Sequence, residues 1–200
     1  ATRRRIQPGV RRVLDSLPRE GNWLDLGCGS ATLALEWIKS GRRGSYCGLD
    51  FSAALLADAQ HALQEIDIPA GVQICLQKAD LQSADWPGDL AHRAYDGVFC
   101  FAALHHIPAY KSRLRFVQQV RTLLPQGAAF VLSNWQFQNS PRLIARVQPW
   151  SVLGVDSKDL ERGDTLLDWR YQLPDQPAQT GYRYVHQFRA EELADLAQEA

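Results

Sequence analysis

Two closely spaced glycines constrain this chain more than any other feature of its sequence. The largely apolar segment Trp23–Leu26 leads into Gly27-Cys28-Gly29, and residues that can begin a helix follow. This order is typical of a buried strand, a tight turn and a helix N-terminus. Glycine has no Cβ and lets the backbone approach a ligand closely, and the first turn of a helix offers unpaired N–H groups. We therefore expect a ligand site at the carboxyl end of this strand.

Strand-like and helix-like segments alternate through residue 134. Strands are predicted at 23–26, 46–50, 72–76, 95–101 and 128–133, and helices at 8–17, 32–39, 53–63 and 110–124. Ser52 has the residue type of a good N-cap for the third of these helices. The alternation predicts an α/β fold, namely a doubly wound, mostly parallel sheet with helices on both faces.

The alternation of predicted strands and helices ends after the fifth strand. Residues 135–183 are rich in aromatic residues and prolines. Because this segment is too long for a plain connection, we expect a lid or substrate-binding insertion. Within it Ser140-Pro141 can begin a short helix, and residues 165–172 and 182–188 are predicted to be extended. The chain is thus predicted to be one domain with an N-terminal helix (1–20), a core (21–134), an insertion (135–183) and a last helix (184–200).

Composition narrows the class of protein. The chain of 200 residues has 46% hydrophobic and 22% charged residues and no net charge, which is ordinary for a globular protein. No apolar run is long enough to cross a membrane, and no apolar segment follows the basic N-terminus as it would in a secretory signal. The four cysteines lack metal-ligand spacing, so we expect reduced core residues, no metal site and a cytoplasmic location.

Acidic and basic side chains stand at the ends of the predicted strands. Asp50 ends the second strand, where a carboxylate can accept two ribose hydroxyls. Asp80 follows the third strand, where it can meet an adenine amino group. His105 and His106 come soon after the fourth. Since open α/β sheets bind ligands at their carboxyl ends, we expect these side chains to border one site.

Taken together, these motifs resemble class I S-adenosylmethionine-dependent methyltransferases over residues 20–134. The resemblance rests on Asp25–Gly29, Asp50, Ala79–Leu81, Tyr95-Asp96 and Leu124–Gly127. It implies a seven-stranded Rossmann-like sheet that binds S-adenosylmethionine and releases S-adenosylhomocysteine. The residues expected to bind the donor are Asp25, Gly27, Cys28, Gly29, Asp50, Phe51, Ala79, Asp80, Leu81, Phe101 and Ala102.

An NAD site fits this glycine turn less well. The third glycine of a dinucleotide motif is missing, and Ser30 and Ala31 stand in its place. Ala31 also departs from the methyltransferase pattern, which usually has glycine there, and this leaves the fine geometry of the loop open. Asp25 has two readings, as a brace of the loop or as a partner of the donor's amino group.

Looser motifs are similar to the tRNA wobble-uridine carboxymethyl methyltransferases. They are Phe101–Pro108, Asn134-Trp135, Gly163-Asp164, Asp168-Trp169 and Tyr182–Phe188. Members of that group normally continue into two more strands after the last helix, whereas this sequence stops at Ala200. A small-molecule O- or N-methyltransferase is the alternative. A third reading is an inactive donor-binding subunit that activates or scaffolds another protein.

Methyl transfer needs no general base if the acceptor is a carboxylate, because a carboxylate is ionised near neutral pH. For a hydroxyl or an amine, His105 or His106 is the natural proton acceptor, whereas His61, His92 and His186 are expected to be surface or packing residues. Residues 97–155 contain six basic residues and no acid. This pattern indicates either an anionic partner such as tRNA or only solvated helix faces. Arg113, Arg115 and Arg142 are the residues predicted to contact its phosphates.

Overall fold

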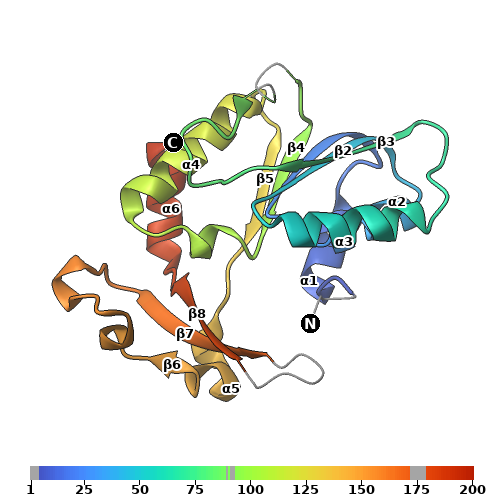
Figure 1. The fold of residues 1–200 in the computed structure, drawn as a ribbon. Helices are drawn as coiled ribbons and strands as arrows, with labels where there is room; N and C mark the ends of the chain where they lie inside the picture. Colours follow the sequence, from blue (N-terminus) through green and yellow to red (C-terminus); the bar gives the residue numbers. More distant parts are fainter. Residues whose placement is uncertain (1–4, 89, 91–92, 172–178) are drawn as a thin grey trace. The chain divides into compact units, whose positions relative to one another are not determined.

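The computed structural model describes residues 5–88, 90, 93–171 and 179–200. His92 and the turn predicted to join the last two extended segments lie outside these ranges. Contacts divide the chain into two compact units (Figure 1). The first comprises Ala1–Ala102 and Gln118–Ser133, and the second comprises Ala103–Val117 and Asn134–Ala200.

A five-stranded parallel sheet forms the centre of the first unit. Its strands, in the order β3-β2-β1-β4-β5, are all parallel. This confirms the predicted α/β fold. The strand bounds are β1 Glu20–Leu26, β2 Arg43–Asp50, β3 Val72–Lys78, β4 Gly97–Phe101 and β5 Ala129–Ser133.

Three helices cover one face of this sheet. Trp23, Tyr46 and Phe99 point to that face and pack in one apolar core with Leu14 and Trp37 from the helices. Ser52 caps the third helix as predicted, because its hydroxyl accepts a hydrogen bond from Leu55 N at 3.3 Å. The helices are α1 Pro8–Ser16, α2 Thr32–Lys39 and α3 Ala53–Gln64.

The second unit has its own antiparallel sheet, in the order β6-β7-β8. Pro141 begins the short helix α5, as predicted, although the Ser140 side chain makes no cap hydrogen bond. The unit contains β6 Val147–Gln148, β7 Asp164–Tyr171, β8 Gln179–His186, α5 Pro141–Ile144 and α6 Ala190–Glu199, and it shares α4, Tyr110–Leu123, with the first unit.

Two details of the expected architecture differ. The central sheet has five strands among the described residues, not the seven that the resemblance implies. The segment predicted as an insertion at 135–183 shares its unit with residues 103–117 and with the last helix. Among the described residues, no helix combines the length and the apolar character needed to cross a membrane.

Candidate functional site

The glycine turn adopts the geometry that its sequence predicts. Gly27 and Gly29 have φ angles of 80° and 56°, in the left-handed region that glycine enters without strain. Leu49 O at the end of β2 accepts hydrogen bonds from Gly27 N at 2.8 Å and Cys28 N at 2.9 Å, which anchors the turn. A Cβ on Gly29 would meet no described atom within 4 Å. The space beside Gly29 is therefore open to a ligand.

Asp50 is a buried carboxylate that the backbone of two loops holds in place. Its Oδ2 accepts a hydrogen bond from Gly29 N and its Oδ1 accepts one from Ser52 N, each at 2.9 Å. A carboxylate has about four lone-pair positions, so each oxygen keeps one for a ligand. Two hydroxyls on neighbouring carbons fit this arrangement, so the geometry suits the ribose that Asp50 is predicted to bind.

Asp25 faces a tyrosine of the neighbouring strand. It is 3% exposed, and Tyr46 Oη donates a hydrogen bond to its Oδ2. Burial raises the pKa of Asp25 to about 7, with a smaller contribution from the charge of Asp50 and an opposing one from the Tyr46 hydrogen bond. The structure thus joins Asp25 to the neighbouring strand. Both predicted roles, as a brace of the loop and as a partner of the donor's amino group, stay predictions.

The ends of β2 and β3 are joined at the place predicted for the adenosine. Ala79 N donates to Asp50 O at 3.0 Å, which brings the segment of Asp80 and Leu81 next to Asp50. Asp80 is exposed and braces its own turn by accepting from Gln82 N at 3.0 Å. Phe51 is 72% exposed. An apolar ring open to water beside Asp50 is available to cover a flat apolar ligand.

Two alanines border the site in a strained backbone conformation. Ala31 and Ala102 have φ angles of 55° and 57°, which costs a residue with a Cβ about 1–2 kcal/mol. Ala31, the departure from the family pattern, thus takes the conformation for which glycine is favoured. Ala102 N donates to Ser133 O at 2.9 Å, and the ring of the preceding Phe101 stacks on Phe99 at 5.4 Å. Strain of this kind concentrates at functional sites.

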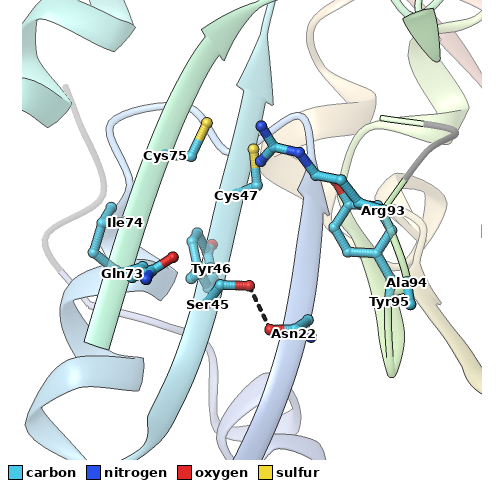
Figure 2. A pocket seen from close by; sticks show the side chains of 10 residues that line it. All are labelled: Asn22, Ser45, Tyr46, Cys47, Gln73, Ile74, Cys75, Arg93, Ala94 and Tyr95. Carbon is cyan, nitrogen blue, oxygen red and sulfur yellow. Dashed lines mark hydrogen bonds between the residues drawn. The ribbon is translucent and has the colours of Figure 1, made fainter. Parts of the chain in front are cut away.

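A separate pocket lies on the other face of the sheet (Figure 2). It has a volume of ≈ 460 Å³, and Asn22, Ser45 and Gln73 line it from the amino-terminal halves of β1, β2 and β3. Cys47 and Cys75 are at its wall as free thiols. None of the residues predicted to bind the donor lines this pocket, so it is not the predicted donor site.

The two adjacent histidines of the second unit have different environments. His105 has no exposed surface, and its Nδ1 lies 3.3 Å from both Asn134 Oδ1 and Trp135 N. His106 is partly exposed, and its Nδ1 lies 2.9 Å from Tyr184 O. A carbonyl only accepts, so Nδ1 carries the proton and Nε2 of the neutral ring has the lone pair. Burial, together with the charge of Arg183, lowers the pKa of His106. Of the two, His106 is the better candidate for a proton acceptor.

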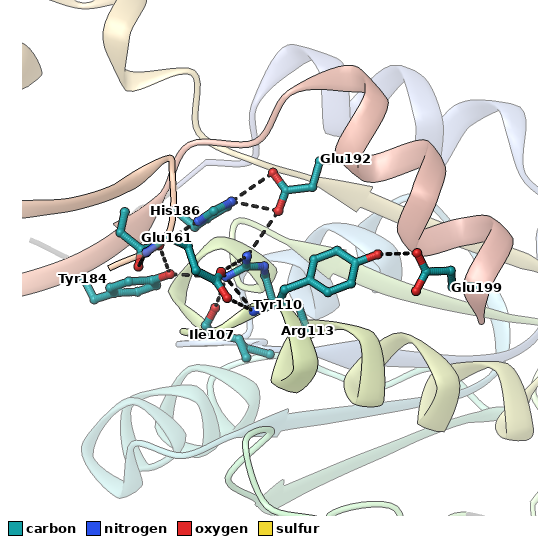
Figure 3. A network of polar contacts seen from close by, with 9 residues as sticks. Ile107, Tyr110, Arg113, Glu161, Tyr184, His186, Glu192 and Glu199 are labelled. Carbon is teal, nitrogen blue, oxygen red and sulfur yellow. Dashed lines mark hydrogen bonds and ion pairs between the residues drawn. The ribbon is translucent and has the colours of Figure 1, made fainter. Parts of the chain in front are cut away.

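Arg113 does not lie where the sequence predicted it. The side chain is 1% exposed, and its Nη2 makes ion pairs with Glu161 Oε2 at 2.7 Å and Glu192 Oε1 at 3.2 Å (Figure 3). The prediction that Arg113 contacts RNA phosphates was therefore wrong. Arg115 and Arg142 are exposed, and their predicted contacts stay predictions.

His186 belongs to the same buried network, although its sequence neighbourhood gave no sign of partners. Its ring nitrogens lie 2.8 Å from Asp164 Oδ1 and 2.8 Å from Glu192 Oε1. Tyr184 Oη donates to Asp164 Oδ1 at 2.6 Å. The ligand atoms of Glu161, Asp164 and His186 lie within 4.8 Å of one another, but each side chain already has partners in the network, so we assign no metal to it.

Comparisons with known proteins agree with this geometry. A family model described as a methyltransferase domain matches residues 1–200. The chain is 28% identical over 127 residues to a probable methyltransferase, ltbC, of Aspergillus luteorubrus, which covers 62% of this chain and 43% of that protein. The chain therefore spans less than half the length of this curated relative.

Solved structures show the same fold. A methyltransferase of Clostridium acetobutylicum that depends on S-adenosylmethionine is similar with a TM-score of 0.65 at 14% identity, over 95% of this chain and 76% of that one. One from Methanosarcina mazei has a TM-score of 0.64 at 20% identity, over 98% of this chain and 84% of that one. Because the sequence identities are low, these structures support the fold alone.

Proposed function

Since the chain belongs to the methyltransferase-domain family and its donor is S-adenosylmethionine, we propose that it transfers the methyl group to an anionic acceptor. The proposed acceptor is the carboxymethyl group on the wobble uridine of a tRNA, and the product is its methyl ester. The donor site described above is the first support for this proposal. The second support is the way the looser motifs fold.

One observation carries the choice of acceptor. The motifs that resemble the wobble-uridine enzymes are scattered from Phe101 to Phe188, yet in the second unit their residues contact one another. Asp164 of one motif accepts a hydrogen bond from Tyr184 of another. The guanidinium carbon of Arg183 lies 5.7 Å from the centre of the Trp135 ring and 5.5 Å from that of Trp169. These contacts form two groups, one on each face of the hairpin of β7 and β8. We propose that the group of Trp135, Trp169 and Arg183 recognises the acceptor.

The residues at the strand ends orient the donor. Bound S-adenosylmethionine supplies a methyl group on a positively charged sulfur, ready for an in-line displacement. Asp50, already fixed by two backbone N–H groups, is the residue that would hold the ribose, and the open space beside Gly29 admits the rest of the donor. An acceptor carboxylate is ionised near neutral pH. Orientation and exclusion of water, not proton removal, are then the main tasks of the protein.

A methyl-transfer assay tests this proposal. The protein is incubated with methyl-labelled S-adenosylmethionine and total tRNA, and the labelled RNA is then treated with mild alkali. We expect label in the RNA and its release by alkali, because a methyl ester is hydrolysed under conditions that leave N-methyl groups intact. Label that resists alkali, or none in RNA, would contradict the proposal. The Asp50→Ala variant serves as the negative control.

The contribution of exposed cations to tRNA binding is tested separately. Lys111, Arg115 and Arg142 are exposed in the second unit, and their joint change to glutamate should lower tRNA affinity and flatten its dependence on salt. Donor affinity should not change. Arg113 is left intact in this variant because it is buried. Equal tRNA affinity of the variant and the wild type would argue against these three residues as phosphate contacts.

A small-molecule O- or N-methyltransferase is the second candidate, and His106 favours it. A partly exposed imidazole with a lowered pKa and a lone pair on Nε2 suits removal of a proton from a hydroxyl or an amine. With such an acceptor, activity should rise as pH increases through the His106 pKa, which lies below its usual 6.5, and His106→Gln should remove that rise. With a carboxylate acceptor this step of the profile is absent. A labelled metabolite extract would identify the acceptor.

A further inference from the structure

Arg183 is held by aromatic rings in the second unit. It lies on β8, on the face that also carries Trp169 of β7, because Arg183 pairs with Leu167 and Trp169 pairs with Gly181 in the strand register. Its guanidinium carbon lies over Trp135 and Trp169 at 5.7 and 5.5 Å from the ring centres. Contacts of this kind attract the cation to the ring faces. Contacts with ring faces do not use the five N–H donors of the guanidinium.

No carboxylate neutralises this cation among the described residues. Arg113 of the same unit is paired with Glu161 and Glu192, and Arg170 of the adjacent strand with Asp168. Arg183, by contrast, makes no ion pair and no side-chain hydrogen bond within the ranges that the structure describes. Burial lowers the pKa of Arg183. A half-buried guanidinium with free donors is an incomplete site, which an anion would complete.

A second unused donor lies beside it. Trp135 Nε1 is buried and has no hydrogen-bond acceptor in the described part of the chain. The Trp135 ring also contacts His106, with ring centres 5.5 Å apart. Trp135 thus joins Arg183 to the histidine whose motif follows β4. The donors of Arg183 and of Trp135 Nε1 both lack an acceptor atom among the residues that the structure describes.

We propose that Arg183 binds the carboxylate of the methyl acceptor, with Trp135 and Trp169 holding the guanidinium for that contact. The inference rests on the proposed function and names the residue that selects its substrate. The planar fork of arginine matches a carboxylate with two parallel hydrogen bonds. Charge-assisted bonds of this kind discriminate strongly against a neutral acceptor of the same shape.

Binding of two nucleosides and one nucleotide tests the assignment. The probes are 5-carboxymethyluridine, the neutral 5-carbamoylmethyluridine of nearly the same shape, and uridine 5′-monophosphate, and each is titrated into protein saturated with S-adenosylhomocysteine. The wild type should prefer the carboxylate to the amide by about 10- to 100-fold. Arg183→Gln should lose this preference. Arg183→Lys, which keeps the charge but not the fork, should retain part of it.

The controls separate recognition from folding. Arg189→Gln removes a positive charge from an exposed position of the same unit and should leave every affinity unchanged. Affinity for S-adenosylhomocysteine and the thermal midpoint of Arg183→Gln should match the wild type. If the thermal midpoint of Arg183→Gln falls, the test rests on Arg183→Lys alone, because this variant keeps a cation over the rings.

Three binding results would overturn the assignment. One is equal binding of carboxylate and amide by the wild type, and another is a carboxylate preference that survives in Arg183→Gln. The third is loss of uridine 5′-monophosphate binding alone, which would make Arg183 a phosphate contact. The labelled-tRNA assay is separate, so a carboxylate preference that depends on Arg183 can stand even if tRNA takes no label. Conversely, tRNA methylation by Arg183→Gln with unchanged KM would overturn only the role of Arg183.

Discussion

Gly97 and Trp23 lie opposite each other on β4 and β1, and a methyl group on Gly97 would lie 2.2 Å from Cζ3 of the indole. The ring occupies the space that a side chain at residue 97 would need. It stacks on Phe99 of the same strand, with ring centres 4.8 Å apart. The absent side chain thus lets a tryptophan lie flat against the strand that leads to Phe101 and Ala102 of the predicted donor site.

Gly97→Ala should destabilise the protein. The added methyl group must displace the Trp23 ring from a filled core, and overpacking of this kind costs about 1–3 kcal/mol or more. Urea unfolding measures the loss. Gly9→Ala is the matched control, because a Cβ there meets nothing within 4 Å, and alanine favours the helix α1. An equal midpoint for Gly97→Ala and the wild type would mean that the ring moves aside without cost.

Asp50→Ala should weaken donor binding by about 1–3 kcal/mol, or roughly 5- to 150-fold, through the loss of hydrogen bonds to a charged group. Calorimetry with S-adenosylhomocysteine measures the change. Asp50→Asn keeps the shape of the side chain and shows whether a shift in the loop of Gly29 contributes. Asp58→Ala changes an exposed acid of α3 and should bind normally. Unchanged affinity in Asp50→Ala would refute the ribose role.

Asp25 should make stability depend on pH between about 4 and about 7. The folded protein keeps the Asp25 proton up to a pKa of about 7, whereas the unfolded chain loses it near 3.8. The folded state therefore binds more protons in this window, and stability falls as pH rises. Above pH 7 both states are ionised and the dependence ends. Asp25→Asn should remove this slope, as urea midpoints from pH 4.5 to 8 would show.

The same measurement tests the second role of Asp25. If the donor's ammonium binds beside this carboxylate, it favours the ionised form and lowers the pKa. Saturating S-adenosylhomocysteine should then move the pH window downward in the wild type and have no such effect in Asp25→Asn. A window that stays in place would leave Asp25 as a brace of the loop.

Arg113→Met should destabilise the protein by about 3 kcal/mol, because it leaves Glu161 and Glu192 without their cation. This value is at the lower end for a broken buried pair, since the Glu161 side chain is 38% exposed and water screens it. Lys111→Met, at an exposed position of the same helix α4, should change stability by no more than about 0.5 kcal/mol. A comparable loss in both variants would contradict the structural role of Arg113.

The sheet and the positions of its strand ends could be predicted because their signals are local. An apolar run followed by Gly27 or Asp50 defines a strand and its end within a few residues. The first two strands nevertheless begin earlier than predicted, since β1 and β2 pair from Glu20 and Arg43 onward. Backbone hydrogen bonds between β1 and β2 extend beyond the apolar residues from which the two strands were predicted.

The buried network could not be predicted because its partners are distant in sequence. Arg113 stands in a stretch without acids, and its partners Glu161 and Glu192 follow 48 and 79 residues later. Charge patterning alone therefore assigned it to the surface. The contacts of Arg183 could not be predicted either, because its aromatic neighbours come from a different strand and from the segment after β5. The motif Tyr182–Phe188 includes Arg183 but does not show which side chain makes which contact.

The two faces of the hairpin of β7 and β8 carry side chains of different chemistry. Asp164, Tyr184 and His186 point to one face and form the ionic network, while Trp169 and Arg183 point to the other. A slip of one residue in either strand would exchange the faces. It would carry Arg183 to the side of the network and remove His186 from its partners. If Arg183 recognises the acceptor as proposed, substitutions at 169 and 183 would change acceptor choice during evolution and leave the ionic network intact. Insertions or deletions within the paired strands would then abolish recognition and stability together.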